Sequence, residues 1–135
     1  MFNGLGMNLG NLSRLSNAET RSISAENFTG EKGKGGMATE GTGAKCARDL
    51  GQGWKVSPSV NIAAGETFTL ADIEGMGAIQ SMWLAGNICR DLIIRIYWDD
   101  QEVPSVECPW PDFFALHWNY NGVQVNSVPV VVAPK

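Results

Sequence analysis

The sequence predicts an all-β protein, a jelly roll or β-sandwich, with an irregular glycine-rich N-terminal region and one short helix. Three observations predict this class. Residues 54–135 contain short stretches in which apolar and polar residues alternate, as in strands buried on one face. Turn-forming residues separate these stretches at intervals of about ten residues, which is typical of sandwiches and jelly rolls. Residues 1–53, in contrast, are rich in glycine, serine and asparagine and show little periodicity.

The strands are expected in the second part of the chain, over residues 54–62, 67–73, 78–86, 92–98, 103–109 and 123–133. The clearest is "LIIRIYW", which places Leu92, Ile94, Ile96 and Trp98 on one face and is rich in β-branched and aromatic residues. The turn sequence "DDQE" follows, and "VPSVECP" returns as a strand. This succession predicts a β-hairpin.

The domain boundaries follow from the same change of pattern. Residues 1–53 form the irregular segment, with a short helix near 44–50 that Thr42 caps and Gly51 ends. Residues 54–135 form the β-sandwich. Because the last residues, "VPVVVAPK", continue an apolar strand without a polar closing segment, we expect the sheet to be truncated at its C-terminal end and to expose an edge.

Composition excludes several classes of function. The net charge of −4 argues against nucleic acid and against an anionic membrane surface, but it permits a neutral ligand such as a sugar. No apolar run is long enough for a transmembrane helix, and the N-terminal sequence lacks the pattern of a signal peptide. The cysteines Cys46, Cys89 and Cys108 are odd in number and far apart, which favours reduced thiols over a disulfide or a metal site. We therefore expect a cytoplasmic protein.

The familiar catalytic and cofactor motifs are absent from the sequence. The glycines of "EKGKGG" do not fit a phosphate loop, and no apolar strand precedes them as a dinucleotide fold requires. The single histidine, His117, has no partner at zinc-ligand spacing and no nucleophile elbow accompanies it. The sequence predicts no cofactor and no metal, and its spacing assigns no pair of catalytic carboxylates.

The run "PWPDFFALHWNY" concentrates aromatic residues, with Asp112, His117 and Asn119 between them. Aromatic rings stack on the apolar faces of sugars, while carboxylates and amides bind the hydroxyl groups. A buried aromatic corner of the sandwich, or a contact between subunits, would have the same composition. The residues alone leave these interpretations open.

Several long and unusual motifs of this sequence resemble those of one known family. "SAENFTGEKGKGG", "DLGQGWKVSPS", "IYWDD" and "DFF" are similar to the opening of proteins that carry domain of unknown function 2961, reclassified as glycoside hydrolase family 172. The similarity extends over about Leu12 to Pro134. It implies the first jelly roll of a double jelly-roll protein that assembles as a trimer or hexamer.

The resemblance also implies a function. Members of the family are retaining enzymes that cleave furanosides, such as α-fructofuranosides and arabinofuranosides, with two carboxylates. It places both catalytic glutamates beyond Lys135, so this chain would be an N-terminal fragment with no catalytic residue of its own and would be inactive alone. The residues expected to bind a furanoside are Arg21, Ser24, Glu26, Asn27, Glu31, Lys32, Asp112, Phe113, Phe114 and Trp118.

Two alternatives to the truncated glycosidase remain at this level. The aromatic cluster and the predicted sandwich also fit a non-catalytic carbohydrate-binding module. An open sheet edge fits a structural domain whose role is homo-oligomerisation.

Overall fold

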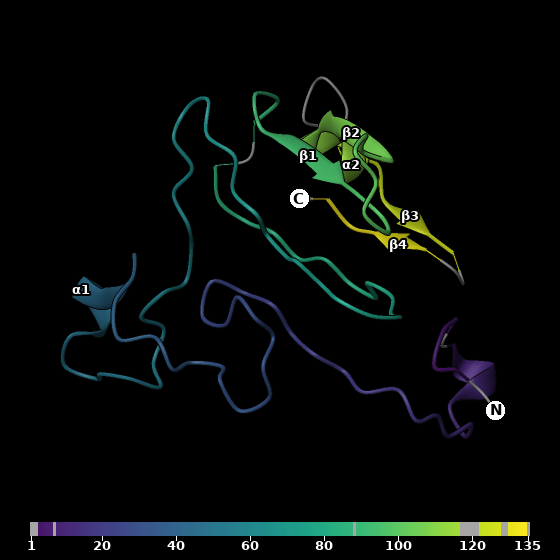
Figure 1. Ribbon diagram of the computed structural model, residues 1–135, viewed down its shortest axis with the longest axis horizontal. Helices are drawn as coiled ribbons and strands as arrows, with labels where there is room; N and C mark the ends of the chain where they lie inside the picture. Colours follow the sequence, from purple (N-terminus) through teal and green to yellow (C-terminus); the bar gives the residue numbers. More distant parts are fainter. Residues whose placement is uncertain (1–2, 7, 88, 117–121, 128–129, 135) are drawn as a thin grey trace. The chain divides into compact units, whose positions relative to one another are not determined.

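The structure of the 135-residue chain is a computed structural model (Figure 1). It describes residues 3–6, 8–87, 89–116, 122–127 and 130–134. The chain divides into two compact units. Ser16–Gly77 make up nearly all of the first unit, and Phe2–Leu15 together with Ala78–Lys135 make up the second.

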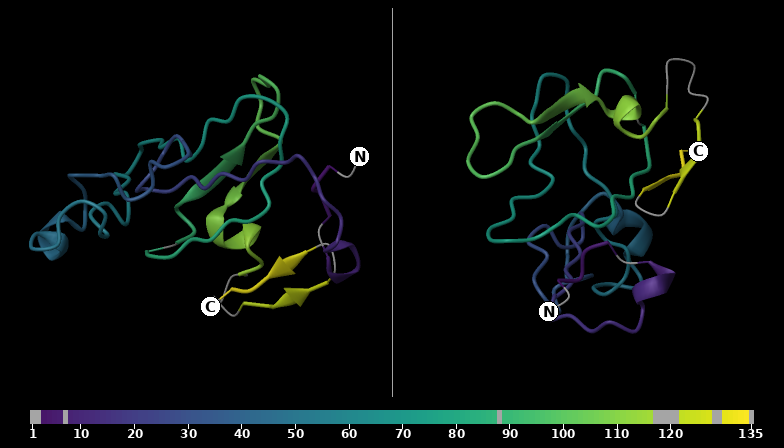
Figure 2. Two further views of the ribbon diagram at one scale, coloured as in Figure 1. Left: turned by 90° about the horizontal axis from the view of Figure 1, so that it is seen from below. Right: turned by 90° about the vertical axis from the view of Figure 1, so that its right-hand side faces the viewer.

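The first unit is built mainly from irregular loops, and its one helix, α1, spans Ala44–Ala47 (Figure 2). The expected cap, Thr42, does not cap it: the N-cap is Gly43, which provides no side-chain hydrogen bond. The physical reason is that the Thr42 hydroxyl has another partner. It lies 3.1 Å from the Ser59 carbonyl oxygen and 2.7 Å from the Ser59 hydroxyl.

The first unit is held together where residues 36–43 lie against residues 53–59. The Gly43 N–H donates to the Val56 carbonyl at 2.9 Å, and the Gly53 N–H donates to the Gly36 carbonyl at 2.9 Å. Val56 is only 4% exposed and is the buried apolar residue of this region. Gly43 has no space for a Cβ atom, which would overlap the Lys55 carbonyl oxygen. Glycine at this position therefore permits the close approach of the two segments.

The second unit contains the predicted hairpin. Strand β1 (Ile93–Ile96) pairs antiparallel with β2 (Val106–Pro109), and the two lie side by side in Figure 1. Ile94 is 3% exposed and Ile96 is half-buried, so the face expected to be apolar does turn inward. On the opposite face Arg95 stands directly across from Glu107. The hairpin prediction from residues 92–109 is confirmed.

The turn between these strands has a backbone that explains its sequence. Asp99 and Asp100 have φ values of 47° and 60°, and the Gln101 N–H donates to the Trp98 carbonyl at 3.1 Å. Consecutive positive φ values are those of a type I′ turn, which forms one part of the connection over residues 97–105. Aspartate tolerates this region better than most residues because its short polar side chain can hydrogen-bond locally.

A single helical turn, α2 (Trp110–Phe113), follows β2 directly. Its Trp110 N–H donates to the Leu92 carbonyl at 2.7 Å, and Trp110 and Pro111 are both buried. Pro111 follows Trp110 and has no N–H to donate, so the ladder does not continue beyond this bond. Towards the C-terminus, β3 (Val125–Asn126) pairs antiparallel with β4 (Val131–Val132). Near the N-terminus, the 3-10 helix η1 spans Leu9–Asn11.

Three of the expected strands are not assigned as strands among the described residues, namely those at 54–62, 67–73 and 78–86. Within residues 78–86, burial alternates only over residues 81–85, where Met82 and Leu84 are half-buried whereas Trp83 is 85% exposed. Alternation fixes which side chains share a face, but a strand also requires a neighbour for its backbone groups. The described residues are thus mostly non-helical, with small two-stranded antiparallel sheets in a β-rich fold.

Candidate functional site

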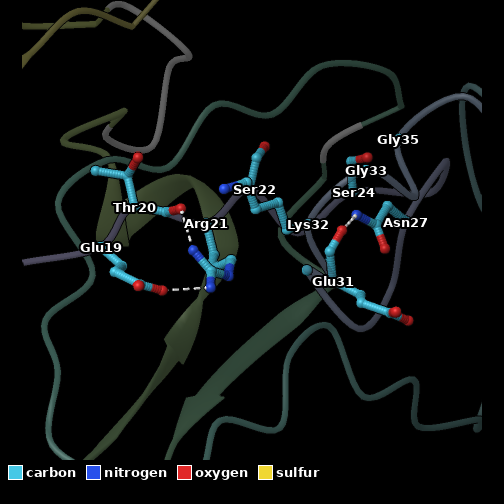
Figure 3. Close-up of a pocket in the computed structure, with 11 residues that line it drawn as sticks. Glu19, Thr20, Arg21, Ser22, Ser24, Asn27, Glu31, Lys32, Gly33 and Gly35 are labelled. Carbon is cyan, nitrogen blue, oxygen red and sulfur yellow. Dashed lines mark hydrogen bonds and ion pairs between the residues drawn. The ribbon is translucent and has the colours of Figure 1, made fainter.

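A cavity of about 490 Å³ lies in the loop at the start of the first unit (Figure 3). This volume is within the range of small-molecule sites. The lining consists of polar side chains and glycines from one continuous stretch of sequence. Its residues are Glu19, Thr20, Arg21, Ser22, Ser24, Asn27, Gly30, Glu31, Lys32, Gly33 and Gly35. Five of them were expected from the sequence to bind a ligand: Arg21, Ser24, Asn27, Glu31 and Lys32.

A tight turn at residues 24–27 shapes one part of the cavity. The Ser24 N–H donates to the Asn27 carbonyl at 3.1 Å, and the Asn27 N–H donates to the Ser24 carbonyl at 2.8 Å. These two bonds hold Ser24 and Asn27 opposite one another, both at the cavity lining. The turn thereby places a hydroxyl group and an amide side by side.

The amide of Asn27 also organises the loop that follows. Its Nδ2 donates to the Glu31 carbonyl at 3.0 Å (Figure 3). Its Oδ1 accepts from the Thr29 hydroxyl at 3.3 Å. Gly30 is buried with φ of +64°, and a Cβ atom there would lie 3.0 Å from Ile23 Cγ1. Only glycine adopts this conformation readily in so little space. Gly30 of "ENFTGEKGKGG" therefore helps to shape a folded loop.

The charged groups of the cavity differ in how they are bound. Arg21 forms an ion pair with Glu19 at 2.5 Å and donates to the Thr20 carbonyl at 3.0 Å (Figure 3). Both side chains of this pair are substantially exposed, so solvent screens it and its contribution to stability is small. Lys32 and Glu31 also contribute to the lining. The cavity therefore offers cations, carboxylates, hydroxyls and an amide, a set that suits a polyhydroxylated ligand.

Glu26, which the sequence grouped with these residues, does not line the cavity. Its Oε1 accepts a hydrogen bond from the Ser57 N–H at 2.8 Å. Its Oε2 is enclosed and has no hydrogen-bond partner among the described residues. The side chain therefore connects the tip of the 24–27 turn to the segment that contains Val56.

The other expected ligand residues belong to the second unit. Phe113 and Phe114 make an edge contact with ring centroids 5.1 Å apart, and Phe114 lies 6.1 Å from Trp110. Trp110 is 6% exposed, so this end of "PWPDFF" is a packed aromatic corner. Trp118, the tenth expected residue, lies outside the described residues, as does His117.

Asp112 is bound on the surface of this aromatic corner by Arg90. Both carboxylate oxygens accept from the guanidinium, with Oδ2 at 2.8 Å from Nη2. These hydrogen bonds lower the pKa of the Asp112 carboxyl below its usual value. On the hairpin, the hydrogen bond from Arg95 to Glu107 at 2.6 Å raises the pKa of Arg95. Sequence reasoning missed Arg90, because a partner 22 residues away leaves no local signal.

The described residues offer hydroxyl, amide, cationic and carboxylate groups at the cavity. No cluster of three or more histidine, cysteine or acidic side chains among them could hold a metal ion. In the cavity, Glu19 is engaged by Arg21. None of the helices in the described part of the chain has the length and apolar character needed to cross a membrane.

Comparison with known proteins shows to which family this chain belongs. No curated protein matches the chain. Residues 54–130 do match a family described as GH172 domain-like, and this range covers more than half of the chain. It includes the hairpin and the aromatic corner, and it confirms the resemblance read from "DLGQGWKVSPS", "IYWDD" and "DFF". The chain therefore belongs to the GH172 domain-like family.

Proposed function

We propose that this chain supplies the first jelly-roll portion of a retaining glycoside hydrolase that acts on furanosides, and that its opening loop binds the sugar. The observation that carries the proposal is the family match over residues 54–130. The cavity at residues 19–35 supports it, because its hydroxyl, amide and charged groups suit a polyhydroxylated ligand. In this proposal, two carboxylates that this chain does not contribute cleave the furanoside.

The absence of a catalytic pair is supported by the state of the carboxylates near the cavity. A retaining glycosidase requires two carboxyl groups about 5 Å apart, one as nucleophile and one as acid and base. Glu19 is engaged by Arg21, and Glu26 is engaged by the Ser57 N–H. Neither is therefore an unbound carboxylate beside the sugar. Glu31 is then the remaining carboxylate of the lining, and a single carboxylate does not make the pair that this chemistry requires.

Calorimetric titration with fructo- and arabino-oligosaccharides tests sugar binding by the loop. Lys32→Ala is expected to weaken binding about 2- to 12-fold, which corresponds to one hydrogen bond of roughly 0.5–1.5 kcal/mol. Lys34→Ala is the matched control, because Lys34 lies in the same loop but outside the lining. Equal losses in both variants, or no heat from the unmodified chain, would contradict binding in this cavity.

The same samples test whether the chain is inactive. We expect no release of the aryl group from an aryl α-fructofuranoside or arabinofuranoside. Turnover by the purified chain would show that it carries a catalytic pair after all.

A second proposed role is assembly with further copies of the chain. Exposed apolar side chains are frequent in the segments that lack strand partners, where Ile73 is 56%, Met76 106% and Trp83 85% exposed. Strands from neighbouring copies would complete the jelly-roll sheets and cover these side chains.

Light scattering across a range of concentrations tests assembly. We expect masses that are multiples of the 14.6 kDa chain mass, with the trimer and hexamer as the expected species. Trp83→Glu should shift the distribution towards the monomer, because it places a charge in the covered surface. Gln80→Glu, which adds the same charge at an exposed polar position nearby, is the control. A monomer at every concentration would contradict this role.

A further inference from the structure

The side chain of Glu26 reaches across 31 residues of sequence to the segment that precedes Pro58. Its Oε1 lies 2.8 Å from the Ser57 nitrogen, and this contact is partly buried. Ser57 belongs to the range that matches the family, whereas the cavity loop precedes that range. The hydrogen bond to the Glu26 carboxylate thus joins the cavity loop directly to the part of the chain that matches the family.

The position of Glu26 within its turn makes this bond relevant to the cavity. Ser24 and Asn27 form the base of the turn and line the cavity, whereas Glu26 stands at its tip. The Ser24 hydroxyl also accepts from the Glu26 N–H at 3.3 Å. Because two backbone bonds join Ser24 to Asn27, a shift of the tip would move both lining residues together.

The second oxygen of Glu26 is in an energetically unfavourable environment. Oε2 is enclosed and lacks a hydrogen-bond partner among the described residues. An enclosed polar atom without a partner is unfavourable and calls for a specific explanation. If Glu26 served only the stability of the fold, an apolar side chain of the same volume would stabilise the fold more. Such a side chain could not accept the Ser57 N–H and could not fix the position of that group.

We propose that Glu26 is a positioning residue, which fixes Ser24 and Asn27 at the cavity by accepting the Ser57 N–H. Glu26 does not touch the sugar. This inference rests on the proposed function, since it assigns Glu26 a part in sugar binding by the same cavity.

Three variants of Glu26 test the proposal by amide hydrogen exchange and by sugar titration. Glu26→Ala should accelerate exchange at Ser57 and at the Ser24 and Asn27 amides at least tenfold, and should weaken sugar binding about 3- to 10-fold. Glu26→Gln retains an acceptor at the same reach and should restore both properties to within about twofold. Glu26→Asp is one methylene shorter and should behave like the alanine variant.

Controls separate positioning from a general loss of stability. Glu66→Ala removes an exposed carboxylate from the same unit and should change neither measurement. Because Glu26 is assigned to act through Ser24, the loss of affinity in Ser24→Ala combined with Glu26→Ala should be smaller than the product of the single losses.

The possible outcomes distinguish this inference from the function on which it rests. Weaker binding by Glu26→Ala with unchanged exchange at Ser24 and Asn27 would overturn positioning and indicate direct contact with the sugar. Failure of the glutamine variant to restore affinity would also overturn it. If the unmodified chain binds no sugar, the proposed function fails, and unchanged exchange in Glu26→Ala would then show separately that Glu26 does not position the turn.

Discussion

Replacement of Trp110 by alanine is expected to lower the free energy of unfolding of the second unit by roughly 3–5 kcal/mol. Trp110 is 6% exposed, packs against Phe114 and opens α2, where its N–H is bonded to Leu92. Removal of the indole leaves a large void that the adjacent backbone, restricted by Pro109 and Pro111, cannot close. Urea denaturation followed by circular dichroism measures the change.

A matched substitution makes the Trp110 prediction specific. Trp98→Ala removes the same side chain at a position that is 50% exposed, in the loop of the same hairpin. Its cost should be below about 1 kcal/mol, because a surface site forms no cavity. Equal losses in the two variants would mean that Trp110 is not the centre of the core of this unit.

The second large effect is expected for Gly43→Ala in the first unit. A Cβ atom at this position would overlap the Lys55 carbonyl oxygen and would lie 2.7 Å from Pro58 Cδ. Neither atom can move easily, since one is backbone and the other belongs to a proline ring. Overpacking of this kind typically costs 1–3 kcal/mol, and more where backbone must shift. The Gly43 N–H, which bonds the Val56 carbonyl, would be displaced as well.

Gly77→Ala provides the comparison for this substitution. A Cβ atom at Gly77 would have nothing within 4 Å, and its φ lies outside the left-handed region. Alanine there should be neutral or stabilising by about 0.4–1 kcal/mol, because it restricts the unfolded chain. Thermal unfolding of both variants, followed by circular dichroism, measures the difference. A Gly43 variant as stable as the Gly77 variant would show that residues 36–43 and 53–59 do not approach so closely.

The local elements were the most predictable part of the fold. The hairpin of β1 and β2 follows from alternation in "LIIRIYW" and from "DDQE", because a two-residue period and a tight turn are both encoded by neighbouring residues. The helical turn α1 lies inside the segment read as helical, but its cap was not predictable. Thr42 hydrogen-bonds to Ser59 instead, and no local rule anticipates a partner 17 residues away.

The structure brings together only part of the residues that the sequence groups as a candidate site. Residue type and the motifs shared with the family pointed to Arg21, Ser24, Asn27, Glu31 and Lys32, among others. The structure places these five around one cavity. The same reasoning grouped Glu26 with them, although its side chain turns to Ser57. Which way a side chain turns depends on the backbone donors that tertiary folding brings near it, and sequence does not show them.

By itself, the sequence determined the family, the β-rich character and the presence of the hairpin, because each of these is encoded in short contiguous motifs. Only the tertiary structure decided which alternating segments obtained strand partners, that Arg90 binds Asp112, and that the glycine-rich loop lines an open cavity. The physical reason is the range of the interactions. Turns and periodicity act over a few residues, whereas strand pairing, ion pairs and glycine contacts join backbone and side-chain groups that only the folded chain brings together.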